Sequence, residues 1–447
     1  MASRERKVVV VGAGLAGLGA ATDLARDGLS VTVLEREARP GGRAACEREQ
    51  GFALEALPPL VSGADRVLLA WIAGIGAGDD ALPLRPVVTG QVARGRVSLV
   101  EPRGILDVAR IPGVRPREAL RLVRLSRLLG RYGARLDPER PENAAPLDDR
   151  SLADFARLYF GASVLDWWMG PELCADTLVE ADEASRALYL RRTRARARAR
   201  PGLPRAPLAD VAEAAAARLR VLPRSEVRVV EEAACGLRVV ANVDGRERIF
   251  DAHAVVLATP APEAARLAPA ILTVAEREAL AGVAYAPAVT LAVALRRPLG
   301  PHPELVRFPH AEGSPLETVL LEPGAGGSRA PDGRGLATLR ATAAWSASAA
   351  GLPDDTVEKE LALAFEGIRP GLRSAALFAR VLRLERALPR FGVGQYRTIA
   401  RLEGLWAELR ASGRRVYLAG DYLVDPSWAG ALASGQRVAR AVRADLA

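Results

Sequence analysis

The stretch Val8-Val9-Val10-Val11-Gly12-Ala13-Gly14-Leu15-Ala16-Gly17 decides the fold of this 447-residue chain. Four consecutive valines predict a parallel strand that is buried on both faces. The glycines follow at the spacing Gly-x-Gly-x-x-Gly, and apolar residues then recur at helical spacing until Gly28. A second predicted strand, at residues 30–34, ends at Glu35. This order of strand, turn, helix and strand predicts a dinucleotide-binding unit.

Each residue of this unit has an expected role. Gly12 permits the tight turn, Gly14 lets the backbone approach a pyrophosphate, and Gly17 lets the helix pack close to the strand. The N-terminus of the helix offers free N–H groups and a positive dipole end to the phosphates. Glu35 is in the position to accept hydrogen bonds from an adenosine ribose.

A glycine turn, Gly41-Gly42-Arg43, follows shortly after Glu35. With this turn, the sequence resembles the flavin amine oxidase superfamily, which includes monoamine and polyamine oxidases, protoporphyrinogen oxidases and carotenoid desaturases. The resemblance implies FAD as the cofactor, with Arg43 making charge-assisted contacts beside its pyrophosphate. It also implies that the backbone of Val227 pairs with the adenine, and that residues 254–260 lead the chain back past the cofactor.

The C-terminal part carries a second half of the same resemblance. Ala419-Gly420-Asp421, Gly430-Ala431 and Ser434-Gly435 are similar to the AGD…GA…SG ending of the family. The resemblance implies that Asp421 binds a ribityl hydroxyl and that the N–H groups of Gly430 and Ala431 face the O2/N1 edge of the flavin. The predicted FAD-binding residues are Gly12, Gly14, Leu15, Ala16, Gly17, Glu35, Arg36, Gly41, Gly42, Arg43, Val227, Ala258, Gly420, Asp421, Gly430 and Ala431.

The motifs cover only parts of the chain, which implies a discontinuous α/β fold of two domains. We expect a Rossmann-type FAD-binding domain built from residues 1–60, 205–274 and 396–447. Residues 61–204 and 275–395 would form an inserted substrate-binding domain, with a mixed sheet and helices. The length of the chain agrees with two domains.

Composition excludes several other classes. The net charge is +9, and Lys7 and Lys359 are the only lysines, but no nucleic-acid-binding motif accompanies the arginines. Cys46, Cys174 and Cys235 are isolated, and the three histidines lack metal-ligand spacing, so we expect neither disulfides nor a metal. Without a signal peptide or a run of about 18 apolar residues, the expected location is cytoplasmic, with peripheral membrane contact left open.

The middle of the chain gives structural rather than catalytic signals. Ser151 is a predicted helix N-cap, and Asp148-Asp149 before it is assigned a structural role. Tyr159-Phe160 and Trp167-Trp168-Met169 are assigned to the domain core rather than to a substrate pocket. The arginine-rich residues 191–200 predict a solvated helix or loop, with a membrane-facing or anionic-substrate patch as the alternative.

Three positions bear on the substrate. Thr290 stands where amine oxidases of the family commonly place a lysine beside flavin N5. Leu57 replaces a frequent glycine near the flavin, and Gln395 replaces a histidine in a stretch similar to protoporphyrinogen oxidases. The missing lysine disfavours ordinary amine oxidation, and the other two departures indicate that the substrate site has diverged from any one subfamily.

The leading hypothesis is therefore hydride transfer from a C–H bond of a mainly apolar small molecule, carotenoid-, isoprenoid- or porphyrinogen-like, to flavin N5. Oxygen or a quinone would reoxidise the flavin, and no catalytic acid or base is assigned. The alternatives are an amine or amino-acid oxidase and a non-catalytic lipid-binding protein of the GDP-dissociation-inhibitor type.

Overall fold

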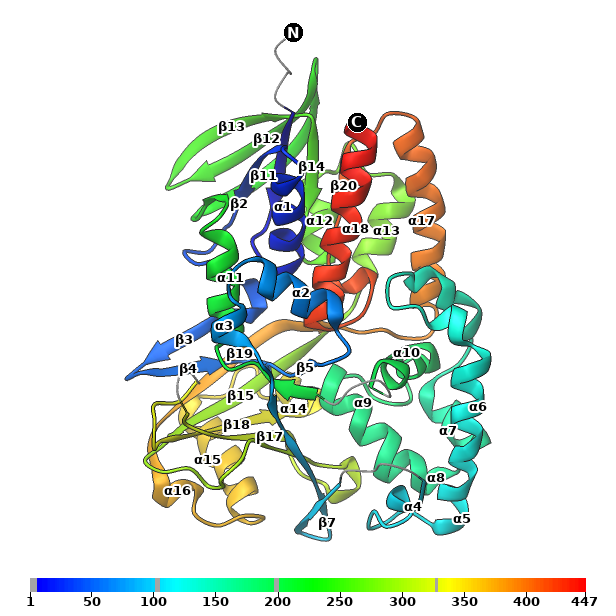
Figure 1. Cartoon of the computed structure of the whole chain (residues 1–447), viewed down its shortest axis with the longest axis vertical. Helices are drawn as coiled ribbons and strands as arrows, with labels where there is room; N and C mark the ends of the chain where they lie inside the picture. Colours follow the sequence, from blue (N-terminus) through cyan, green and yellow to red (C-terminus); the bar gives the residue numbers. More distant parts are fainter. Residues whose placement is uncertain (1–5, 101–104, 197–200, 326–328) are drawn as a thin grey trace.

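A five-stranded parallel sheet forms one end of the molecule (Figure 1). The structure is a computed structural model that describes residues 6–100, 105–196, 201–325 and 329–447. The strand order of the sheet is β10-β2-β1-β14-β20. The strands are β1 (Lys7–Val11), β2 (Ser30–Leu34), β10 (Arg220–Leu222), β14 (Ala254–Leu257) and β20 (Val416–Leu418). The predicted dinucleotide-binding unit is confirmed as β1, helix α1 (Leu15–Arg26) and β2, with the helix ending before Gly28.

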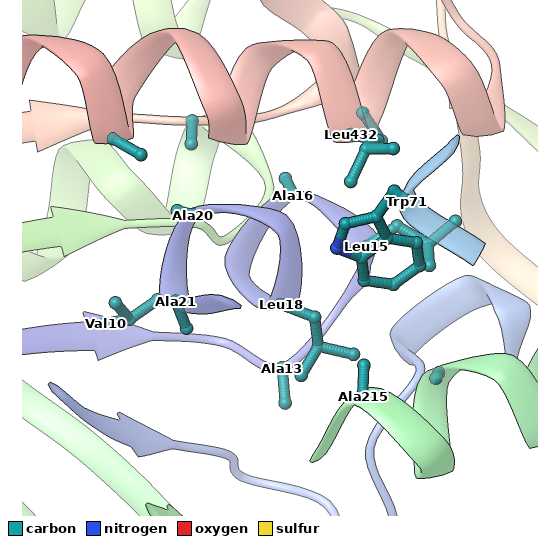
Figure 2. Packing of buried hydrophobic residues seen from close by; sticks show 14 of the residues in the cluster. Val10, Ala13, Leu15, Ala16, Leu18, Ala20, Ala21, Trp71, Ala215 and Leu432 are labelled. Atoms are coloured by element: carbon teal, nitrogen blue, oxygen red, sulfur yellow. The ribbon is translucent and has the colours of Figure 1, made fainter. Parts of the chain in front are cut away.

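The four valines of β1 are buried on both faces, as their run predicted. Val8 and Val10 belong to the core shared with α1, whereas Val9 and Val11 belong to the core on the opposite face of the sheet. Helix α1 packs against α18 (Trp428–Leu446), and a Cβ atom on Gly435 of α18 would lie 2.0 Å from the Ala16 carbonyl oxygen. Figure 2 shows this packing, with residues of α2 (Arg66–Gly74) and α11 (Leu208–Ala216) completing the cluster.

An antiparallel sheet of three strands contributes to the core on the opposite face. It consists of β11 (Ser225–Ala233), β12 (Gly236–Val243) and β13 (Arg246–Ala252). Helices α12 (Ala261–Leu267), α13 (Val274–Ala281) and α17 (Gln395–Ala411) contribute to the same core.

The second large sheet has seven strands in the order β19-β15-β18-β17-β16-β7-β8. Its pairs are antiparallel except for β16 with β7. Helix α15 (Asp354–Glu366) packs on one face. The strands are β7 (Val88–Ala93), β8 (Arg96–Leu99), β15 (Tyr285–Leu295), β16 (Glu304–Arg307), β17 (Leu316–Pro323), β18 (Gly335–Ala341) and β19 (Ala376–Pro389).

A lobe of helices within residues 105–196 packs beside this sheet (Figure 1). Its main helices are α6 (Val123–Arg131), α7 (Leu152–Tyr159), α9 (Gly170–Thr177) and α10 (Arg186–Arg196). Phe160 and Met169 are buried in the lobe, and Tyr159, Trp167 and Trp168 pack against its core. The assignment of these side chains to the domain core is confirmed.

Shorter elements connect these layers. The strands are β3 (Cys46–Glu49), β4 (Phe52–Glu55), β5 (Val61–Ser62), β6 (Arg85–Pro86) and β9 (Pro201–Leu203). The helices are α3 (Gly78–Ala81), α4 (Ile105–Val108), α5 (Pro116–Ala119), α8 (Ala162–Val164), α14 (Ala343–Ser348) and α16 (Leu372–Ala375). Within the described ranges, no helix combines the length and the apolar character needed to cross a bilayer.

Two structural predictions for the middle of the chain are confirmed. The Ser151 hydroxyl accepts the backbone N–H of Asp154 at 3.1 Å and caps α7. Asp148 is fully buried, and its Oδ2 accepts the backbone N–H groups of Tyr396 and Arg397 at 2.7 and 3.2 Å. Asp148 thus holds the first turn of α17 against the helical lobe, which is a structural role.

The sheets follow the expected division of the chain. The parallel sheet draws its strands from residues 1–60, 205–274 and 396–447, and the seven-stranded sheet draws its strands from residues 61–204 and 275–395. The arrangement is the predicted α/β fold. The exact domain boundaries stay a prediction.

Candidate active site

A cavity of about 660 Å³ connects the carboxyl end of the parallel sheet to the seven-stranded sheet and the helical lobe. This size is typical of a site for a cofactor or another small molecule. The predicted FAD-binding residues that line it are Gly12, Gly14, Leu15, Ala16, Glu35, Arg36, Gly41, Gly42, Arg43, Val227, Ala258, Gly420, Asp421 and Ala431. The structure therefore brings together residues from both ends of the sequence and from the returning segments. Gly17 and Gly430 lie outside this lining.

The three glycines of the Gly-x-Gly-x-x-Gly turn differ in the space available for a side chain. A Cβ atom on Gly17 would lie 1.9 Å from the Gly12 carbonyl oxygen, and one on Gly12 would lie 2.8 Å from the Ala258 carbonyl oxygen. A Cβ atom on Gly14 would meet no protein atom within 4 Å. Gly12 and Gly17 are thus required by packing, whereas the space beside Gly14 belongs to the cavity at the start of α1. This open space fits a pyrophosphate at the N-terminus of the helix.

Glu35 holds the glycine turn to the end of β2. Its Oε2 accepts the backbone N–H of Ala13 at 2.6 Å, and its Oε1 accepts the N–H of Glu37 at 2.9 Å. The side chain is buried where it meets the cavity. Each carboxylate oxygen can accept a further hydrogen bond, so the geometry is compatible with the predicted ribose contact, which stays a prediction.

Arg43 and Asp421 bind each other. Arg43 Nη1 and Nη2 lie 2.8 Å from Asp421 Oδ2 and Oδ1, and Nη1 also donates to the Ala387 carbonyl at 2.9 Å. Burial is the largest influence and lowers the pKa of Arg43, but the charge and hydrogen bonding of Asp421, with a contribution from Tyr285, together leave that pKa above its ordinary value. The sequence assigned these residues separate contacts with FAD. Those contacts stay predictions, and the ion pair is the relationship that the sequence did not indicate.

The backbone N–H groups of Gly430 and Ala431, which were predicted to face the flavin, form hydrogen bonds within the first turn of α18. The Ser427 hydroxyl accepts the N–H of Gly430 at 3.0 Å, and the Ser427 carbonyl accepts the N–H of Ala431 at 2.9 Å. Because neither N–H group is free, the structure does not test their predicted contact with the flavin edge, which stays a prediction. Ser434 Oγ accepts the N–H of Gly420 at 3.0 Å, which ties α18 to the end of β20.

An apolar wall lines part of the cavity. It consists of Leu57, Leu384, Leu388 and Trp428, which belong to one apolar cluster beneath the seven-stranded sheet. Leu57 is the residue that replaces a frequent glycine of the family, and it does line the cavity. This wall is an apolar surface that disfavours water.

The arginine-rich run is not solvated, and that prediction was wrong for residues 191–196. Arg192 lies 2.9 Å from Asp176, and Arg196 lies 2.8 Å from Glu172. The two arginines are four residues apart on α10, and the two acids are four residues apart on α9, so one face of each helix matches the other. Arg192 and Asp176 also line the cavity. Residues 197–200 lie outside the described part of the chain.

Thr290 is fully buried on β15 and is outside the cavity lining. Its hydroxyl donates to the Ala56 carbonyl at 2.8 Å. Neither Lys7 nor Lys359 lines the cavity, so no lysine takes the place of the one expected in an amine oxidase. Gln395, the other departure from the family, donates from Nε2 to the Tyr422 carbonyl at 3.1 Å and is likewise outside the lining.

Several charged residues of the cavity were missed in the sequence, among them Asp176 and Arg340. Arg340 belongs to the otherwise apolar strand β18, with the sequence Gly-Leu-Ala-Thr-Leu-Arg-Ala. A charged residue inside an apolar strand is costly to bury without a partner, and this is the signal that could have identified it. Asp176 is on α9 and carries no comparable sequence signal.

The His310 side chain contacts two acidic residues, Glu180 and Glu317, which the sequence pattern did not predict. Its Nδ1 lies 3.0 Å from Glu180 and its Nε2 lies 3.2 Å from Glu317, which raises the pKa of His310 to about 10. Cys174 is also nearby, since one ligand atom each of Cys174, His310 and Glu317 lie within 4.8 Å of one another. Both imidazole nitrogens are already engaged, and the adjacent Arg340 repels a cation. The group is therefore an ion triad and not a favourable metal site.

The site and the fold define the class of protein. A glycine turn at a helix N-terminus, an acidic residue after the second strand and a cavity leading to a second sheet are the features of an FAD-dependent oxidoreductase. The chain belongs to the family of flavin-containing amine oxidoreductases, whose family model matches residues 15–443. The family resemblance and the FAD cofactor expected from the motifs are confirmed.

Relatives of known sequence match short segments. A phytoene dehydrogenase of Streptomyces griseus is 52% identical over 60 residues, which cover 13% of this chain and 12% of that protein. A lysine-specific histone demethylase 1 homolog 3 of Arabidopsis thaliana is 59% identical over 44 residues, which cover 10% of this chain and 3% of that protein. These matches span a small part of each relative.

Solved structures match over nearly the whole chain. A putative protoporphyrinogen oxidase from Exiguobacterium superposes with a TM-score of 0.73 at 17% identity, covering 98% of this chain and 99% of that one. A putrescine oxidase with bound putrescine superposes with a TM-score of 0.77 at 16% identity, again covering 98% and 99%. At these identities the likeness confirms the two-domain α/β fold.

Proposed function

We propose that this protein removes a hydride from a C–H bond of a mainly apolar small molecule. When bound, FAD supplies the electron-accepting ring, with N5 as the atom that receives the hydride. The observation that carries the proposal is the continuity of the cavity, which extends from the glycine turn at Gly14 to the apolar wall of Leu57, Leu384, Leu388 and Trp428. A substrate on this wall would lie at the opposite end from the nucleotide.

The protein's own residues would bind, orient and exclude water. The start of α1 would hold the pyrophosphate, and the Arg43–Asp421 pair would fix the loop and the strand end on either side of the cofactor. The wall, of which Leu57 and Leu388 are almost completely buried, would keep water away from the reacting C–H.

The substrate class we favour is carotenoid-, isoprenoid- or porphyrinogen-like, with oxygen or a quinone as the electron acceptor. The absence of both lysines from the cavity lining is what disfavours amine oxidation. An apolar substrate would be taken up from a membrane surface, so a cytoplasmic protein with peripheral membrane contact is the location we propose.

Anaerobic bleaching of the flavin tests the proposal. The purified protein, with its bound flavin, is mixed separately with amines, porphyrinogens and polyenes, and the flavin absorbance is followed. We expect bleaching by a porphyrinogen or a polyene. Fast bleaching by simple amines would establish the amine-oxidase alternative, and a colourless protein that fails to take up FAD would establish the lipid-binding alternative.

A matched pair of variants connects the reaction to the apolar wall. Leu57→Gln places a polar group in the wall and should slow bleaching about tenfold, because aligning an apolar substrate against it becomes less favourable. Leu377→Gln, at an exposed position of β19, should bleach at the rate of the unmodified protein. Equal rates in the two variants would contradict the assignment of the wall.

A further inference from the structure

Arg340 is the second of five polar side chains in a row that crosses the seven-stranded sheet. It is paired with Thr290 on β15 and with Thr318 on β17. Thr318 is paired with Arg307 on β16, and Arg307 is paired with Gln91 on β7. Because residues directly opposite one another on neighbouring strands point to the same side, the five side chains share one face of the sheet. A row of this kind in a sheet core is unusual, since buried strand positions are normally apolar.

The helical lobe covers this face. Arg340 Nη2 donates a hydrogen bond to the carbonyl of Ala175 on α9, and Gln91 Nε2 donates to the carbonyl of Trp167 at 2.8 Å. Ala175 lines the cavity together with Arg340. The row of polar residues therefore reaches the cavity at Arg340 and continues beneath the lobe.

Four members of the row have polar atoms without a partner. Arg340 Nε, Thr318 Oγ1, Arg307 Nε and Gln91 Oε1 are all buried and make no hydrogen bond. Buried polar atoms are nearly always hydrogen bonded, so a group of unpaired atoms in one place indicates a missing partner. Of the four residues, Arg340 is the one that lines the cavity and can reach a ligand there.

Arg340 is a buried cation that forms no direct ion pair with a described carboxylate, although the charge of Glu317 acts on it from a greater distance. Its side chain belongs to a residue that is only 2% exposed, and no carboxylate of the described ranges lies within ion-pair distance of it. Burial lowers the pKa of Arg340 to about 10, although the charges of Glu317 and Cys174 act in the opposite direction. Placing a guanidinium in such an environment is unfavourable unless an anion compensates it.

The neighbouring arginine of the cavity is already compensated. Arg192 lies 2.9 Å from Asp176 and 2.6 Å from Asp425. Arg192 is thus neutralised by two carboxylates, whereas Arg340 has no carboxylate of the described ranges at ion-pair distance. Arg340 lines the same cavity as the apolar wall.

We propose that Arg340 binds the carboxylate of the substrate, whose apolar body lies against Leu57, Leu388 and Trp428. The inference rests on the proposed function and narrows its substrate class to apolar carboxylic acids. Arg340 is well suited to this contact, because a guanidinium offers parallel N–H donors that match the two oxygens of a carboxylate. The chemistry at the C–H bond is unchanged, and Arg340 fixes the position of the molecule along the wall.

Two probes of the same shape test the inference. Phenylacetate carries an apolar body and a carboxylate, and phenylacetamide replaces that carboxylate with a neutral amide. Binding to the flavin-loaded protein is measured by calorimetry and by the perturbation of flavin absorbance. We expect saturable binding of phenylacetate and at least tenfold weaker binding of phenylacetamide.

Three variants assign the effect to one side chain. Arg340→Met should weaken phenylacetate binding about 10- to 100-fold, the range expected for a lost hydrogen bond to a charged group, and should change phenylacetamide binding less than twofold. Arg340→Lys should retain part of the affinity. Arg307→Met is the matched control, because Arg307 is a buried arginine of the same row that is outside the cavity lining. It should bind phenylacetate within twofold of the unmodified protein.

Several outcomes would overturn the inference. They are equal affinity for the two probes, unchanged phenylacetate binding in Arg340→Met, or an equal loss in Arg307→Met. If Arg340→Met does not fold, the probe pair with the unmodified protein and with Arg340→Lys decides the question. A purified protein that holds no flavin would contradict the proposed function. If the flavin is bleached by neutral polyenes but the protein does not bind phenylacetate, only the role of Arg340 is contradicted.

Discussion

Arg43 and Asp421 are separated by 378 positions in the chain, yet their side chains form a two-pronged ion pair with both nitrogen–oxygen distances at 2.8 Å. The Asp421 side chain is 4% exposed, and that of Arg43 is 26% exposed. The pair joins the glycine turn after β2 to the strand end of β20, and both residues line the cavity. The two halves of the cofactor motif are thus held together before any ligand is considered.

Removing one partner of this pair should destabilise the fold. Arg43→Met leaves the buried Asp421 carboxylate without its cation, and we expect a loss of about 3 kcal/mol in the free energy of unfolding, measured in urea. Asp421→Asn should destabilise in the same direction, and the double variant should lose less than the sum of the two. Arg380→Met removes an exposed ion pair with Glu49 and should cost less than about 1 kcal/mol. Strictly additive losses at Arg43 and Asp421 would contradict the coupling.

The two glycines at the start of α1 should respond in opposite ways. Gly14→Val should fold with nearly unchanged thermal stability, because its backbone is extended (φ −74°, ψ 176°) and its Cβ meets no protein atom within 4 Å. It should retain no FAD, since the new side chain fills the space for the pyrophosphate. Gly17→Ala should instead lower the melting temperature, because its Cβ would lie 1.9 Å from the Gly12 carbonyl. Unchanged flavin content in Gly14→Val would contradict the assigned site.

Asp148 should matter for stability and not for the cofactor. Asp148→Ala removes the acceptor of two N–H groups at the start of α17, and we expect a loss of about 2 kcal/mol, in the upper range for a helix cap. Flavin content per folded protein should stay constant. Asp149→Ala is the control, because Asp149 is more exposed and pairs with Arg150 and Arg186. A selective loss of flavin in Asp148→Ala would argue for a role in the active site.

The ion triad of His310 should make stability depend on pH. Hydrogen bonds to Glu180 and Glu317 raise the pKa of His310 from 6.5 to about 10. A raised pKa in the folded state means that the stabilisation is complete below pH 6.5 and is lost as the pH rises through about 10. Because the imidazole is 41% exposed, we expect His310→Gln to cost only about 1 kcal/mol at pH 6. Urea unfolding at pH 6, 8 and 10 measures the difference in unfolding free energy between the unmodified protein and His310→Gln. This difference should shrink toward zero as the pH rises, and a difference that grows with pH would contradict the triad.

The sequence by itself determined the cofactor unit. Four valines, three glycines and an acidic residue at fixed spacing dictated β1, α1 and β2, because each of these requirements concerns residues that are close together in the chain. The same holds for the Ser151 cap, whose pattern is local. Matching the C-terminal motif to the family then led to the prediction that both halves of the sequence bind one cofactor.

Only the tertiary structure decided which charged side chains meet in the cavity. Composition suggested that residues 191–200 are solvated, but α10 packs on α9 with matching spacing, so Arg192 and Arg196 lie in ion pairs. The position of Arg340 in the cavity depends on the register of β18 with β15 and β17. It also depends on the packing of α9 over that face of the sheet. Which charges meet, and which one remains without a partner, depends on how distant segments pack. The physical reason is that a side chain's electrostatic surroundings are set by neighbours in space, and local sequence patterns do not specify them.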